Sequence, residues 1–92
     1  MSPSLAACLS SAGRQVKLAR LRRHLSRAAV CAEAGISQQT LIRLESGEAS
    51  VAIGVLARVL EVMGLEGDIA SIAMADPEGR AIQDRELLHE DS

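Results

Sequence analysis

Gln38, Gln39 and Arg43 carry the hydrogen-bonding groups best suited to chemistry in this sequence. Each glutamine amide offers a donor and an acceptor together, which matches the N6 and N7 edge of adenine. In a helix, Arg43 projects from the same side one turn later, and its guanidinium can bind guanine O6 and N7 or neutralise a phosphate. Taken alone, three such residues would more often only solubilise a surface helix. Their interpretation therefore depends on the elements that position them.

Two short helical patterns lie on either side of Gly35. Ser26 is a candidate N-cap of the first helix, and Gly35 ends that helix because glycine adopts the left-handed conformation without a Cβ penalty. Ser37 is a candidate N-cap of the second helix, which runs to about Ser46 and is closed by Gly47. With so few residues between them, the two helices must cross at a steep angle.

This arrangement, residues 26–46, resembles the helix-turn-helix of the lambda-repressor-like (Xre) family of bacterial and phage DNA-binding regulators. The agreement covers residue type and spacing together, which makes it specific, and it extends from about Val16 to Leu65. The positions that carry it are Leu25, Ser26, Cys31, Gly35, Ile36, Ser37, Thr40, Leu41, Leu44, Glu45 and Gly47. The resemblance implies an all-α fold: a compact domain of five helices over residues 1–75, followed by a short acidic tail over residues 76–92.

The resemblance also implies which residues meet DNA. Family members contact base edges from the start of the second helix, and commonly contact a phosphate from the start of the first helix. The DNA-binding residues predicted in this way are Arg27, Ser37, Gln38, Gln39, Thr40 and Arg43. The loop at residues 47–50 is often basic in the family but contains Glu48 here, so a phosphate contact from that loop is not expected.

Two further charged residues are assigned to structure. In the family, an arginine near the end of the first long helix pairs with a glutamate near the end of the recognition helix. Arg20 and Glu45 match those positions, which implies a buried or half-buried ion pair. Cys31 falls where the family prefers a small residue between two closely packed helices, and we expect an inert buried thiol.

The charges divide the chain into two halves. Residues 1–47 contain seven basic and two acidic residues, a net +5, whereas residues 48–92 contain three basic and ten acidic residues, a net −7. Because screening limits the influence of distant charges, a basic surface in the first half is compatible with a phosphate partner despite the overall charge of −2.

Periodicity outlines the remaining elements. We expect a helix over residues 14–23, with His24 as its left-handed C-cap, and helices over residues 53–63 and 66–75, with a turn at 76–79. Residues 1–13 are ambiguous, because Ser4 could cap a helix that two serines and Gly13 would weaken. Residues 80–92 could form a strand, a helix against a partner, or no fixed structure.

The predicted fourth helix is apolar on more faces than one small domain can cover. We therefore expect a homodimer in which Val55, Val59 and Val62 face the second chain. A two-fold dimer would read double-stranded DNA at a near-palindromic operator, with half-sites ~34–36 Å apart. The leading hypothesis is a sequence-specific transcriptional repressor of this kind.

A second hypothesis adds a protein partner. Residues 52–65, continuing to Asp76 and Pro77, are similar to the antitoxins that accompany HipA-type kinases. An antitoxin would bind its toxin and also regulate its own operon. The acidic tail would suit a basic partner surface.

Other classes have little support in the sequence. No catalytic constellation, metal-ligand cluster or phosphate-binding glycine loop is present, so we expect no enzyme, no metal and no cofactor. RNA binding is disfavoured because no aromatic side chain can stack on a base. No apolar run approaches the ~18 residues of a membrane span, and two cysteines are too few for a disulfide framework, which fits a reducing cytoplasm.

Overall fold

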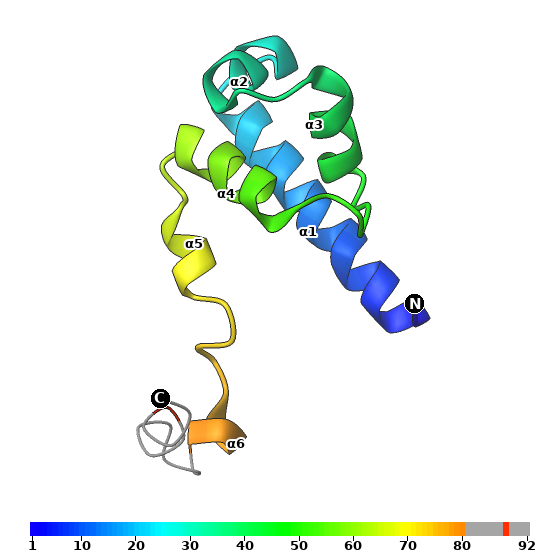
Figure 1. The fold of residues 1–92 in the computed structure, drawn as a ribbon, viewed down its shortest axis with the longest axis vertical. Helices are drawn as coiled ribbons and strands as arrows, with labels where there is room; N and C mark the ends of the chain where they lie inside the picture. Colours follow the sequence, from blue (N-terminus) through cyan, green and yellow to red (C-terminus); the bar gives the residue numbers. More distant parts are fainter. Residues whose placement is uncertain (81–87, 89–92) are drawn as a thin grey trace.

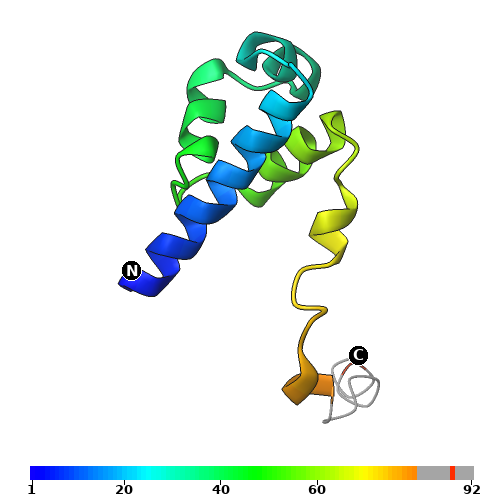
Figure 2. The ribbon, with the colours of Figure 1, turned by 180° about the vertical axis from the view of Figure 1, so that it is seen from behind.

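The computed structural model describes residues 1–80 and residue 88 of the 92-residue chain, and this part contains helices and no strand. The all-α prediction is confirmed (Figure 1). The helices are α1 (Pro3–Arg22), α2 (Arg27–Ala34), α3 (Gln38–Glu45), α4 (Ile53–Val62), α5 (Gly67–Ala70) and α6 (Pro77–Arg80). Both views show α1 to α4 packed together, with α5 beside α4 and α6 well away from this bundle (Figures 1 and 2).

Helix α1 is longer than the sequence suggested. Ser2, not Ser4, is its N-cap: the Ser2 hydroxyl accepts from the Leu5 amide at 3.1 Å, and Pro3 occupies the first turn, where no amide donor is needed. Gly13 does not interrupt the helix, because it is required for packing. A Cβ at Gly13 would lie 2.6 Å from the carbonyl oxygen of Glu45, so only glycine lets α1 approach the end of α3 this closely.

The turns around α2 follow the predicted chemistry. The Ser26 hydroxyl accepts from the Ala29 amide at 3.0 Å, and Gly35 ends α2 with φ 70°. Ser37 caps α3 in the same way. His24 follows α1 with φ 54°, which confirms its left-handed conformation.

The core lies where α1, α2, α3 and α4 meet. Val30 of α2, Leu41 of α3 and Val59 of α4 are its fully buried side chains, each no more than 1% exposed. Val59 therefore cannot face a second chain, and the predicted dimer surface is wrong at this residue. Val55 and Val62 remain partly exposed. The surplus of valines on α4 is explained in part by packing within the chain.

The segment after α4 differs from the prediction. Gly64 follows the end of α4 with φ 73°, but the helix predicted over 66–75 is only Gly67–Ala70. Glycine at its start has low helix propensity, and the exposed residues that follow gain little packing energy. A longer helix is therefore not stabilised. Ile69 packs against the core, whereas Ile72 is 60% exposed.

The predicted turn at 76–79 is the start of α6. Asp76 accepts from the amide of Gly79 at 2.9 Å through its carboxylate, which is the geometry of an N-cap. Beyond Arg80, the alternatives considered for the end of the chain lie outside the described residues, apart from residue 88.

Candidate nucleic-acid interface

Helix α3 has one buried face and one outward face. Leu41, Leu44 and Glu45 are buried against the bundle. The opposite side presents two exposed glutamines and, one turn later, a partly exposed arginine, so the structure brings the three predicted base-reading residues together on one surface. The residues of this outward face are Gln38, Gln39, Ile42, Arg43 and Ser46.

Ile42 was missed by the sequence reasoning. It is 42% exposed and lies one turn after Gln38 and Gln39 on the outward face of α3, although it is apolar. The signal was present in the sequence: Leu41 and Leu44 already fill the inward positions of this helix, so the adjacent isoleucine had to point outward.

Arg43 is held by the loop that follows α3. Its Nε donates to the Glu48 carboxylate at 2.6 Å, and its Nη2 donates to the Ser50 hydroxyl at 2.8 Å. Both side chains of the ion pair are substantially exposed. In the sequence, Glu48 indicated only that this loop is not basic. Its contact with Arg43 was not predicted.

The base of α3 is fixed by a buried ionic cluster. Arg20 of α1 donates to Glu45 from Nε at 2.7 Å and from Nη2 at 3.1 Å, which is the predicted pair. Arg20 also donates from Nη1 to the carbonyl of Leu25 at 3.0 Å. Arg27 at the start of α2 adds a third contact to Glu45 at 3.2 Å, a structural role that the sequence did not suggest. One carboxylate thus connects three helices.

Comparison with protein families matches residues 16–69, more than half of the chain, to the HTH_3 helix-turn-helix family. The chain belongs to the HTH_3 family. The match begins in the second half of α1 and ends in α5, so it includes α2, α3 and the ionic cluster. No curated protein matches the chain.

As an HTH_3 member, the protein is a DNA-binding transcriptional regulator, a class that is typically non-enzymatic. Its helix-turn-helix consists of α2 and α3. The HipA-associated branch is not established by this match. Among the described residues, no helix has the length and apolar character that crossing a membrane requires.

Ser37 and Thr40 of the HTH_3 motif bind each other. The Ser37 hydroxyl accepts from the Thr40 amide at 3.1 Å, and the two hydroxyl oxygens are 2.9 Å apart. Ser37 is exposed and Thr40 partly exposed. Both hydroxyls therefore stabilise the start of α3 in the free protein, and each retains hydrogen-bonding capacity towards an outer partner.

Cys31 links α2 to the turn before α3. Its thiol lies 3.5 Å from the carbonyl oxygen of Ser37 and is buried. Burial raises the pKa of the Cys31 thiol above its ordinary value, with a further contribution from the charge of Glu45, while Arg20 and Arg27 act in the opposite direction. A neutral, buried thiol is suited to packing and not to redox chemistry.

Proposed function

We propose that this HTH_3 protein is a sequence-specific repressor that binds duplex DNA as a homodimer, with α3 in the major groove. The observation that carries the proposal is the outward face of α3: two amides, one guanidinium and one apolar side chain on a helix whose other face is fixed in the core. A helix with hydrogen-bonding side chains on one exposed face can reach base edges without disturbing the fold.

The proposed contacts divide into two kinds. Gln38 and Gln39 would bind adenine through paired amide bonds, and Arg43 would bind guanine. Arg27 would approach a backbone phosphate, aided by the N-terminus of α2, while its Nε remains on Glu45. Ser37 and Thr40 would be secondary phosphate contacts. Phosphate contacts set the position of the protein, and base contacts set its sequence preference.

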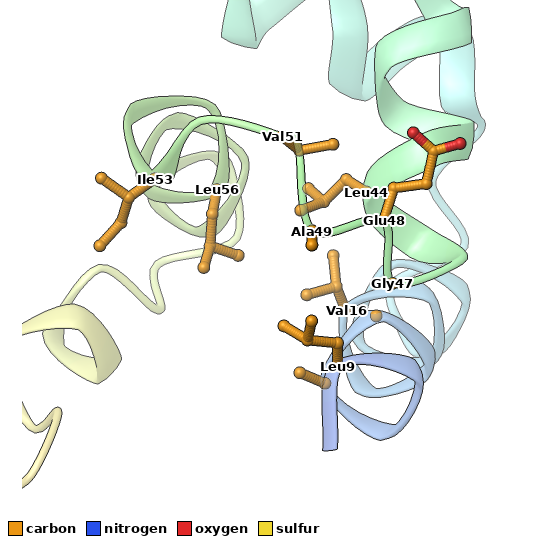
Figure 3. A pocket seen from close by; sticks show the side chains of 11 residues that line it. Leu9, Val16, Leu44, Gly47, Glu48, Ala49, Val51, Ile53 and Leu56 are labelled. Atoms are coloured by element: carbon orange, nitrogen blue, oxygen red, sulfur yellow. The ribbon is translucent and has the colours of Figure 1, made fainter. Parts of the chain in front are cut away.

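The homodimer is proposed because one recognition helix reads too few base pairs for selectivity, whereas a two-fold dimer reads both halves of a near-palindrome. An apolar groove offers a surface for it. The groove comprises two adjacent cavities, one of about 170 Å³ between α1, the loop after α3 and α4, and one of about 250 Å³ between α1, α4 and the α5 segment. The two cavities share Ala12, Val16 and Leu56. Figure 3 shows the smaller cavity, with Leu56 of α4 across from Leu9 and Val16 of α1, and Ile53 at its outer edge.

Two exposed residues mark the ends of this groove. Ile53 is 63% exposed and Ile72 is 60% exposed, and each lines one of the two cavities. The proposed dimer surface is therefore this groove together with Val55 and Val62, which are partly exposed but line neither cavity. It no longer includes Val59, which is buried. We assign residues 1–75 to the DNA-binding domain and residues 76–92 to a tail for assembly or partner binding.

Selection of bound duplexes from a random library would test the proposal. The wild type should enrich a near-palindromic site, and Gln39→Ala should bind that site less tightly by ~1–3 kcal/mol, with relaxed preference at one or two base pairs. Arg27→Ala should weaken binding to all duplexes about equally and flatten the salt dependence. Wild-type affinity of Gln39→Ala for the selected site would contradict the assignment of base readers.

An antitoxin is the second candidate function. It is favoured by the segment after α5, where exposed Ile72 and Met74 lie close in sequence to the carboxylates of Asp68 and Asp76, away from the DNA-binding helices (Figures 1 and 2). Such a surface could bind a toxin protein by combining apolar and ionic contacts. A neighbouring gene for a HipA-type kinase, and binding of that kinase that is lost in Ile72→Asp, would support it.

A further inference from the structure

Among the described residues, acceptors contact the guanidinium of Arg43 along one edge only. Its Nε contacts the Glu48 carboxylate at 2.6 Å and its Nη2 contacts the Ser50 hydroxyl at 2.8 Å, and these two nitrogens share one edge of the planar group. Glu48 and Ser50 are also in contact with each other, at 3.4 Å. Two acceptors from one loop therefore fix the plane of the guanidinium as well as its position.

The other edge of the guanidinium remains available. Arginine has five N–H donors in a rigid fork, and within the described chain no acceptor contacts Nη1. The end of the fork, formed by Nη1 and the second hydrogen of Nη2, can bind guanine O6 and N7 together. The contacts to the loop thus use the donors that an end-on bidentate guanine contact does not need.

The loop that supplies the two acceptors is itself fixed. Gly47 has φ 83°, and a Cβ at this position would lie 2.6 Å from the carbonyl oxygen of Leu9, so the loop is packed against α1. The Glu48 amide donates to the Arg43 carbonyl at 3.1 Å. Figure 3 shows the Glu48 carboxylate pointing away from the apolar cavity beside this loop. The position of Glu48 therefore follows from the fold and not from chance surface contact.

Holding Arg43 in this way would favour binding to one DNA sequence over binding to any duplex. A free arginine loses rotamer freedom when it binds, whereas a restrained one has lost it already. In addition, the Glu48 charge offsets that of Arg43, which reduces attraction to phosphates, the part of DNA that carries no sequence information.

We propose that Glu48, assisted by Ser50, is a positioning residue that makes Arg43 a guanine reader. This inference rests on the proposed function, because it concerns how the same face of α3 discriminates between bases. It assigns a specificity role to the one acidic residue in a loop that was expected only to lack a phosphate contact.

The test uses Glu48→Ala, Arg43→Ala and the double variant, with Glu33→Ala as the control. Glu33 is an exposed carboxylate on α2, so its removal makes the same change in net charge within the proposed DNA-binding domain. The probes are the duplex selected by the wild type, duplexes with each guanine of that site replaced in turn, and a random duplex. Affinity is measured at several salt concentrations.

A bidentate contact discriminates between bases by about 5- to 150-fold. We expect Glu48→Ala to reduce discrimination at one guanine by at least ~3-fold, and to steepen the salt dependence by about one counterion as the released Arg43 neutralises a phosphate. Arg43→Ala should remove discrimination at that same guanine, and adding Glu48→Ala to it should change discrimination no further. Glu33→Ala should leave discrimination unchanged.

Three results would overturn the inference: unchanged discrimination in Glu48→Ala, an equal loss in Glu33→Ala, or no loss in Arg43→Ala. In each case a selective wild type would leave the proposed repressor standing, although the third result would also remove the proposed guanine contact of Arg43. A wild type that shows no preference among duplexes would contradict both the proposed function and this inference. Matching helical content and unfolding midpoints of Glu48→Ala and the wild type would show that the variant is folded.

Discussion

Arg20 on α1 and Glu45 at the last residue of α3 form a buried, bidentate ion pair, with both side chains no more than 6% exposed. Arg27 of α2 also donates to Glu45, and the Leu25 carbonyl accepts from Arg20, so each of the three guanidinium nitrogens of Arg20 donates one hydrogen bond. Because the cluster joins α1, α2 and α3 at one carboxylate, it fixes the orientation of the helix that is proposed to enter the groove. Arg20 is therefore a structural residue and a poor choice for a DNA-contact variant.

We expect Glu45→Ala to destabilise the fold by ~3–5 kcal/mol, because it leaves the Arg20 charge buried without its partner. Glu61→Ala on the exposed side of α4 is the control, since it removes the same charge from a solvated position. Denaturant unfolding followed by circular dichroism would measure both. Equal midpoints for the two variants would show that the ionic cluster contributes nothing to stability.

Gly13 and Gly54 should respond in opposite directions to alanine. In α1, the new methyl group would meet carbonyl oxygens of Leu44 and Glu45 at under 3 Å, and overpacking of this kind costs ~1–3 kcal/mol or more. In α4, nothing lies within 4 Å of the added Cβ at Gly54, so the higher helix propensity of alanine should add up to ~1 kcal/mol. Thermal unfolding would separate them, and a Gly13→Ala variant as stable as the wild type would contradict the close approach.

Ile42 should contact a thymine methyl group if α3 lies in the major groove. An exposed apolar side chain on the same face as Gln38 and Gln39 has no other apolar partner on base edges. Replacing thymines of the selected site by uracil, one at a time, should weaken wild-type binding at one position. Ile42→Ala should lose that sensitivity and retain its response to changes elsewhere in the site. Equal binding of all uracil duplexes by the wild type would exclude the contact.

The apolar groove predicts the oligomeric state. We expect the wild type to sediment as a dimer at ~100 μM, and Ile53→Asp and Ile72→Asp to shift it towards monomer with reduced operator affinity. Both residues are exposed, so the variants should remain folded. Val59→Asp is unsuitable because it would place a charge in the core. Leu21→Asp, at an exposed apolar residue outside the groove, is the control, and a monomeric wild type would contradict the dimer.

The two cysteines should differ in reactivity. Cys8 is exposed, whereas burial holds the pKa of the Cys31 thiol above its usual range. Because the thiolate is the nucleophile, iodoacetamide at about pH 8 should alkylate Cys8 and spare Cys31, and both should react in denaturant. Raising the pH should increase Cys31 modification only beyond the range in which an ordinary thiol ionises. Mass spectrometry of the native protein would check this, and rapid native labelling of Cys31 would refute it.

The sequence by itself determined the elements that depend on local chemistry. Ser26, Gly35 and Ser37 define the ends of α2 and α3 through caps and a left-handed residue, and these features involve only neighbouring atoms of the chain. The ion pair between Arg20 and Glu45 also followed from residue types at positions that the resemblance had already placed.

Tertiary structure decided the features that depend on contacts between distant residues. Gly13 lies within α1 because α3 and the loop after it pack against this position and leave no room for a Cβ. Local rules about glycine in helices do not indicate such a contact. Val59 is in the core and Ile72 is exposed because the bundle, and not helical periodicity, sets which side of α4 and of the segment after α5 is covered. The contact of Arg43 with Glu48 likewise required the loop to turn back over α3, a path fixed by the packing of Gly47 on α1.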